Sequence, residues 1–153
     1  SARQTLNLST GECKMGARVL VVDDEVDMLS LIKLILTEKT DYEVVTTNNP
    51  LEVENLLGEK NFDVIITDLK MPIMDGMDVV DAIRKKDGLV PIIIITAYSS
   101  VESAEEAVEK GALDYITKPF RQEQLLISIK RALDWYNLKK ENIELQKKLG
   151  KNK

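Results

Sequence analysis

The chain has 153 residues, of which 44% are hydrophobic and 31% charged, and its formal net charge is −5. This length fits one domain with an appendage, and the composition is that of an ordinary globular protein. The negative charge argues against direct nucleic-acid contact by this segment, and no apolar run reaches the roughly 20 residues that a membrane-spanning helix needs. Histidine is absent, which excludes a Ser-His-Asp triad, a histidine general base and a phosphohistidine donor.

The first residues of the chain carry no structural pattern. Residues 1–16 lack both an apolar segment and a periodic arrangement, so we interpret them as an N-terminal extension and not as a secretory signal. Cys13 is the one cysteine in the sequence, which excludes an internal disulfide. Together these features predict a reducing, cytoplasmic location without membrane association.

Five short apolar runs alternate with helical patterns along residues 17–133, which we interpret as one domain. The runs lie at 18–22, 43–46, 63–67, 91–95 and 113–117. The first, third and fourth are continuous β-branched sequences, which are typical of parallel strands covered on both faces. The alternation predicts a doubly wound α/β domain with a five-stranded parallel sheet.

Between these runs, apolar residues recur at helical spacing. Asn49 followed by Pro50 is typical of a helix N-cap and its first helical position. The stripes expected to face the core are Met28, Leu29, Ile32, Ile35 and Leu36 in one helix, Met77, Val80, Ala82 and Ile83 in another, and Val101, Ala104, Ala107 and Val108 in a third.

The last helical pattern begins near Arg121 and meets no helix breaker before Gly150, well beyond the mean helix length of about 11–12 residues. Its first part, as far as Leu133, should cover the sheet, and residues 134–153 should form a helical linker with six lysines and three acids. A heptad seam in this linker predicts a parallel coiled coil in which an asparagine fixes the register. The seam residues are Trp135, Leu138, Asn142, Leu145 and Leu149. A frayed, solvated helix is the alternative that remains open.

Polar residues stand where four of the apolar runs end. They are Asp23 with Asp24, Asp68, Thr96 and Lys118. Ligands of doubly wound sheets bind beyond the carboxyl ends of the strands, so we expect these side chains to converge. Close carboxylates repel one another unless a cation intervenes, and an all-oxygen site suits Mg²⁺ or Mn²⁺. Such a site could accept a phosphoryl group on an aspartate, because this transfer needs positioning and charge neutralisation more than a strong base.

Taken singly, each of these residues could be a helix cap, a turn residue or a surface side chain. Four motifs in this order, however, resemble the signatures of response-regulator receiver domains. The motifs are residues 21–25, 68–76, 95–97 and 118–120. The resemblance covers about residues 16–133 and implies a flavodoxin-like sheet with strand order 2-1-3-4-5 and an extended C-terminal helix.

The resemblance implies a role for each acidic residue of these motifs. Asp68 would be the phosphoacceptor. Mg²⁺ would be held by Asp23, Asp24, Asp68 and the backbone carbonyl of Lys70. Members of the family act as signalling switches and not as conventional enzymes. The implied chemistry is therefore limited to self-catalysed phosphoryl acceptance with slow self-dephosphorylation.

The remaining motif residues would bind and sense the phosphoryl group. Thr96, Ala97 and Lys118 would contact its oxygens, and Tyr115 would turn inward as Thr96 moves. The peptide bond between Lys118 and Pro119 is cis in the family. Bulky Tyr98 is expected to shield the phosphoryl group from water.

Residues 96–104 and the long basic helix resemble the nitrogen-regulator class, although Ser99 stands where a glycine is common. In that class a helical linker joins the receiver to an ATPase domain acting on an alternative sigma factor, and then to a DNA-binding domain. The resemblance implies a sensor histidine kinase as partner, a homodimer, and control of transcription through output domains outside this segment. The alternatives are a stand-alone relay receiver, a phosphate-independent receiver and an aspartate-nucleophile phosphohydrolase. The last usually needs an acid where Lys70 stands.

Overall fold

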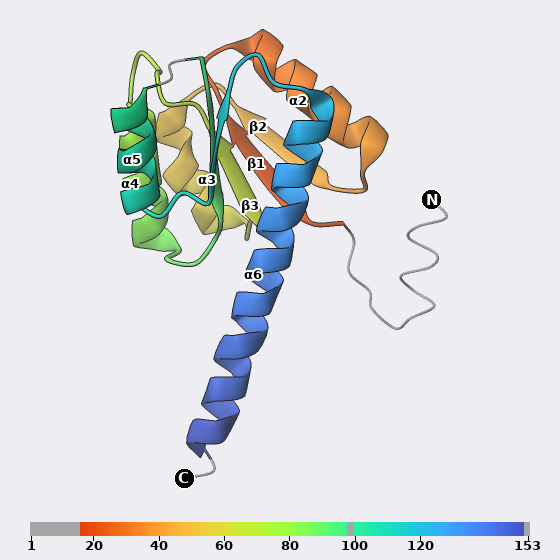
Figure 1. The fold of residues 1–153 in the computed structure, drawn as a ribbon, viewed down its shortest axis with the longest axis vertical. Helices are drawn as coiled ribbons and strands as arrows, with labels where there is room; N and C mark the ends of the chain where they lie inside the picture. Colours follow the sequence, from red (N-terminus) through yellow and green to blue (C-terminus); the bar gives the residue numbers. More distant parts are fainter. Residues whose placement is uncertain (1–15, 98–99, 152–153) are drawn as a thin grey trace.

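The computed structural model describes residues 16–97 and 100–151 (Figure 1). The strands of this part are β1 (Arg18–Val22), β2 (Glu43–Thr47), β3 (Val64–Thr67), β4 (Ile92–Thr96) and β5 (Asp114–Thr117). The helices are α2 (Val26–Lys39), the 3₁₀ turn η1 (Pro50–Glu52), α3 (Val53–Glu59), α4 (Gly76–Lys86), α5 (Val101–Glu109) and α6 (Gln122–Lys151). Each predicted strand agrees with the observed one to within one residue.

The strands form one parallel sheet in the order β2-β1-β3-β4-β5, as predicted. In the register of the sheet, Val22 at the end of β1 lies beside Thr67 at the end of β3. Thr96 at the end of β4 likewise lies beside Thr117 at the end of β5. The carboxyl ends of four neighbouring strands therefore share one edge, which we call the upper edge. The opposite edge, where the strands begin, is the lower edge.

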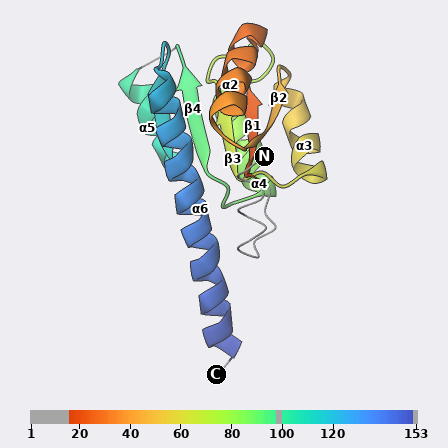
Figure 2. The same ribbon diagram turned by 90° about the vertical axis from the view of Figure 1, so that its right-hand side faces the viewer.

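Helices cover both faces of the sheet (Figures 1 and 2). Successive residues of β1 point to opposite faces: Leu20 belongs to the core beneath α3, α4 and α5, and Val21 to the core beneath α2 and α6. Ile94 and Ile95 of β4 divide in the same way. Two buried faces explain why these runs are continuously apolar and do not alternate with polar residues.

The expected stripe of α5 was wrong for its two valines. Val101 and Val108 are 74% and 67% exposed, whereas Ala107 is buried in the core. A helix turns by about 100° per residue, so Val108 points well away from its neighbour Ala107, and Val101, two turns earlier, shares the face of Val108. The face of α5 that carries Ala107 therefore packs on the sheet, and both valines lie on the surface.

The cap predicted for the second helical segment is confirmed. The side chain of Asn49 accepts a hydrogen bond from the Leu51 N–H at 3.0 Å, and Pro50 occupies the first helical position. The segment begins as a 3₁₀ turn and continues as α3. Tightened first turns of this kind are common at helix ends.

The final helix, α6, runs for 30 residues and continues through Gly150. Its first part covers the sheet as predicted, since Leu125, Ile129 and Ala132 are fully buried. After this buried first part, the helix leaves the sheet and extends past the lower edge (Figures 1 and 2). In the described part of the chain, no helix is both long enough and apolar enough to cross a membrane. Leu138, Leu145 and Leu149 are 59–66% exposed, so the coiled coil stays a prediction.

Candidate functional site

The sheet itself brings the candidate residues together at the upper edge. Asp23 follows β1 and Asp68 follows β3, and the Asp68 N–H donates to the carbonyl of Val22 at 3.1 Å. Lys118 follows β5, and its N–H donates to the carbonyl of Thr96 at 2.8 Å. The backbone pairing thus continues one residue past the strands. The side chains of Asp23, Asp68 and Lys118 converge as predicted. Thr96 joins them through its backbone bond to Lys118, and the convergence of its hydroxyl and of Asp24 stays a prediction.

Lys118 lies between the two aspartates. Its ammonium nitrogen is 2.9 Å from Oδ2 of Asp23 and 2.9 Å from Oδ2 of Asp68. The side chains of all three residues are at most 7% exposed. A third acid, Glu25, approaches the same ammonium at 3.4 Å, but its side chain is 60% exposed.

The charges at this edge do not balance. Burial raises the pKa of Asp23 above its usual range, even though Lys118 and the Glu25 N–H donate hydrogen bonds to it. Burial opposes the charged form of Lys118 too, but the hydrogen bonds from Lys118 to Asp23 and Asp68 prevail and raise its pKa. One ammonium therefore keeps its proton firmly but cannot compensate two buried carboxylates. The site has negative charge left over, which favours binding of a cation.

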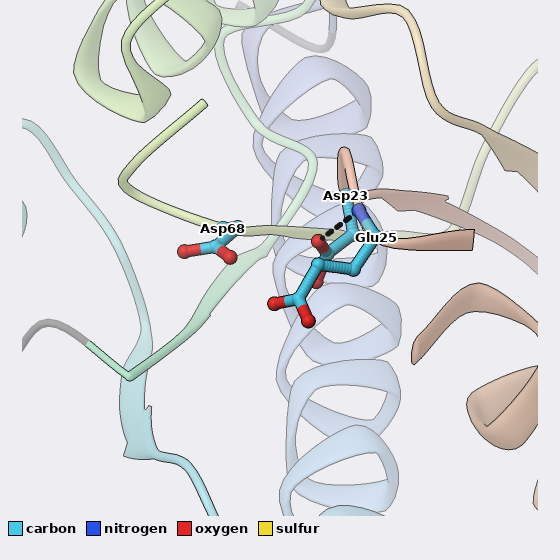
Figure 3. A group of neighbouring side chains, drawn as sticks. All are labelled: Asp23, Glu25 and Asp68. Carbon is cyan, nitrogen blue, oxygen red and sulfur yellow. Dashed lines mark hydrogen bonds between the residues drawn. The ribbon is translucent and has the colours of Figure 1, made fainter. Parts of the chain in front are cut away.

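Three carboxylates could supply oxygens to such a cation. One oxygen from each of Asp23, Glu25 and Asp68 lies within 4.8 Å of the other two (Figure 3). A compact all-oxygen set is what Mg²⁺ and Mn²⁺ prefer, so the residues present fit the expected metal. Asp24 is partly exposed and is not a member of this group. Its role as a ligand stays a prediction.

Glu25 was not predicted as a residue of the site. The backbone N–H of Glu25 donates to Oδ1 of Asp23 at 2.9 Å (Figure 3), and the side chain of Glu25 turns back toward Lys118. An acid two residues after a strand-end aspartate, in a turn that leads into a helix, is the signal that could have identified it.

The other motif residues lie around this group. The Lys70 N–H donates to Oδ1 of Asp68 at 3.2 Å, so the loop after β3 folds back on the carboxylate. Thr96 is 1% exposed, and Ala97 follows it on the surface. Their contacts with a phosphoryl group, and the metal contact of the Lys70 carbonyl, stay predictions.

Two further expectations concern the region beside β5. The peptide bond between Lys118 and Pro119 is cis, as the resemblance implied. Tyr115 is half-buried against the core beneath α3, α4 and α5, and its movement stays a prediction. Tyr98 and Cys13 lie outside the described residues.

Gly76 permits the close return of the loop that carries Asp68. The Gly76 N–H donates to the carbonyl of Leu69 at 2.8 Å, and a Cβ atom at Gly76 would lie 2.1 Å from the carbonyl oxygen of Asp68. We expect Gly76→Ala to lower the free energy of unfolding by about 1–3 kcal/mol, because backbone must move to admit the methyl group. Gly58→Ala is the control: apart from the adjacent residues and the backbone of its own helix, no atom lies within 4 Å of its Cβ position, and alanine should stabilise α3 by about 1 kcal/mol. Urea unfolding measures the free energy of unfolding of both variants. Equal changes in the two would contradict this explanation of the loop.

The chain is similar to parts of proteins that are described as regulators. The family model of the response regulator receiver domain matches residues 19–130. A response regulator described as NtrX-like from Rickettsia bellii (strain RML369-C) is 38% identical over 133 residues, which are 86% of this chain and 28% of that protein. The transcriptional regulatory protein ZraR of Klebsiella oxytoca is 36% identical over 115 residues, covering 75% of this chain and 26% of its own length. The chain thus spans little more than a quarter of these relatives.

A solved structure supports the fold. The beryllofluoride-activated NtrC4 receiver domain dimer matches with a TM-score of 0.74 and 39% identity, covering 78% of this chain and 98% of that chain.

Proposed function

Because this chain belongs to the response regulator receiver domain family, we propose that it accepts a phosphoryl group on Asp68 from a sensor histidine kinase. One observation carries the proposal: two buried carboxylates at the ends of β1 and β3 share a single ammonium, 2.9 Å from each. Such an excess of negative charge favours the binding of a divalent cation. The cation and Lys118 can then tolerate the added charge of a phosphoryl group.

Different residues of the site would bind the metal, form the new bond and pair with the transferred group. Asp23 and Asp68, with Asp24 and the Lys70 carbonyl, would hold Mg²⁺, which supplies positive charge for the phosphoryl oxygens. A carboxylate oxygen of Asp68 forms the new bond to phosphorus, while the bond from phosphorus to the kinase histidine breaks and its electron pair returns to the imidazole nitrogen. The donor must be a partner, since this chain contains no histidine. Lys118 is already beside Asp68 and keeps its proton, so it can pair with the transferred group.

Phosphorylation would then bias a two-state equilibrium. The phosphoryl group gives Thr96 an acceptor that exists only in the modified protein, and such a differential contact can shift populations. Thr96 ends β4, and Tyr115 lies in the neighbouring strand β5. The output surface would be α5, β5 and α6, where Val101, Val108 and Ile127 are more than half exposed.

The regulated event would be self-association and control of output domains in a transcription regulator of the nitrogen-regulator class. Exposed apolar side chains on α5 and along α6 support an interface. The relatives named above are described as regulators, and the matching NtrC4 receiver is described as a dimer. By analogy, the remaining parts of such a protein would follow the linker helix.

The test is phosphorylation by a small-molecule phosphodonor with Mg²⁺, followed by intact mass measurement. We expect a gain of one phosphoryl group, its loss when Mg²⁺ is chelated, and no gain in Asp68→Asn. Asp27→Asn, an exposed position on α2, is the matched control and should be modified like the native chain. A phosphoryl group retained in Asp68→Asn would refute the assignment.

A further inference from the structure

One residue of α6 reaches the opposite side of the sheet. The helix covers the face that it shares with α2, and this cover ends with Leu133. Tyr136, one turn later, packs instead against the core beneath α3, α4 and α5. Tyr136 therefore joins the core of the other face of the sheet. The helix itself extends past the lower edge (Figure 2).

Two loops of the lower edge receive this side chain and its neighbour Lys140. Burial, followed by the nearby carboxylates of Asp87 and Asp63, raises the pKa of Tyr136. The ammonium of Lys140 lies 4.3 Å from the centre of the Tyr136 ring and 3.9 Å from Oδ1 of Asp63. Asp63 is itself held, because its Oδ2 accepts from the Arg18 N–H at 2.8 Å. Residues four apart share one helix face, so both contacts fasten the same side of α6.

The second loop is tied to the switch side of the domain. Oδ1 of Asp87 accepts from the Val90 N–H at 3.0 Å. The guanidinium of Arg84 donates to the carbonyl of Val90 at 2.7 Å and to that of Gly111 at 3.1 Å. Gly111 lies in the turn before β5, the strand that carries Tyr115. The loop whose Asp87 carboxylate lies near Tyr136 is therefore hydrogen-bonded, through Val90 and Arg84, to the turn before β5.

A groove of about 600 Å³ lies between α6 and the beginning of β1 and β2 at this level. Leu133 and Asn137 line its helix side, and Lys140 with its ion-pair partner Asp63 lines it as well. The contacts of Tyr136 and Lys140 therefore attach α6 to the domain beside an open groove.

We propose that Tyr136 and Lys140 form a clamp that fixes the direction in which α6 leaves the domain. The clamp makes residues 134–140 part of the domain, so the free linker begins after Lys140. A movement of the loops at the lower edge would then change the direction of the linker. The existence of the clamp follows from the fold, whereas its use in signalling rests on the proposed function.

Distances between two spin labels test the clamp without any phosphorylation. Cys13 is replaced by serine, and cysteines at the exposed positions Glu54 on α3 and Glu144 on α6 carry the labels. Excess unlabelled chain ensures that each assembly holds one labelled copy. We expect a narrow distance distribution for the native background, and distributions about twofold broader for Tyr136→Ala and for Lys140→Ala.

Lys139→Ala is the matched control, since Lys139 is the exposed neighbour of Lys140 and lies 5.8 Å from the centre of the Trp135 ring. It should leave the distribution narrow. Circular dichroism checks that each variant is folded. If Tyr136→Ala is unfolded, the double variant with Tyr136→Phe and Lys140→Ala takes its place. Unchanged widths in the clamp variants, or equal broadening in the control, would overturn the clamp. If the native chain fails to accept a phosphoryl group, the proposed function is refuted. The distance measurement, which involves no phosphorylation, still tests the clamp.

Discussion

Replacing Lys118 with glutamine is expected to lower the free energy of unfolding by about 3–5 kcal/mol when divalent cations are absent. The ammonium that disappears lies 2.9 Å from a carboxylate oxygen of Asp23 and 2.9 Å from one of Asp68. All three side chains are nearly inaccessible to water. Without Lys118, two buried carboxylates face each other with neither a counterion nor full hydration.

Magnesium should restore most of this loss. The Lys118→Gln site keeps its carboxylates, so a divalent cation can take over the neutralising role of the ammonium. Binding to the folded state alone stabilises a protein by mass action. We therefore expect Mg²⁺ to raise the stability of Lys118→Gln more than that of the native chain, as measured by urea unfolding with Mg²⁺ and with a chelator.

Lys110→Gln is the control for the loss of a lysine. Lys110 forms an ion pair with Asp81 at 3.0 Å, close to the 2.9 Å distances from Lys118 to its two aspartates. The side chains of Lys110 and Asp81, however, are 30% and 51% exposed. An exposed pair is worth about 0.2–1 kcal/mol, and Mg²⁺ should not compensate for it. Comparable losses in the two variants, or a loss in Lys118→Gln that Mg²⁺ leaves unchanged, would contradict the account of an unbalanced site.

The sequence predicted best where one local rule was sufficient. Three of the five runs are continuous β-branched sequences, which are typical of strands buried on both faces, and four runs end at a candidate site residue. All five strands were located to within one residue. The strand-end rule then brought Asp23, Asp68 and Lys118 together, and the structure confirms it. The order of the strands came from the family resemblance, because periodicity alone does not determine which strands are neighbours.

The features that were missed depend on geometry between distant segments. Glu25 reaches the site only because the turn after β1 directs its side chain back, and the strand-end rule considers just the first residues after a strand. Tyr136 falls between the heptad positions 135 and 138, and its partners Asp63 and Asp87 belong to loops remote in the sequence. For α5, apolar residues stand on two adjacent helix faces, and only packing decides that Ala107 is inside and Val108 outside.

Removing the end of α6 is expected to weaken self-association at least about 100-fold, which corresponds to roughly 2.7 kcal/mol. Leu138, Leu145 and Leu149 are exposed at heptad spacing, and each would be buried against the same residue of a second chain. A chain ending at Lys140 keeps the clamp but loses most of the seam, and one ending at Leu133 loses both. Sedimentation over a range of concentrations compares these two chains with the full one.

A charge placed on or beside the seam separates the coiled coil from the alternative of a solvated helix. Leu145→Glu should weaken association about as much as the truncation at Lys140, because the charge would be buried between two helices. Gln146→Glu adds the same charge one residue further on, at an exposed position outside the seam, and should have little effect. If both substitutions behave alike, or if the chain ending at Leu133 associates as tightly as the full chain, residues 134–153 form no coiled coil. The exposed apolar side chains of α5 and of the first part of α6, such as Val101, Val108 and Ile127, would then be the remaining surface for self-association.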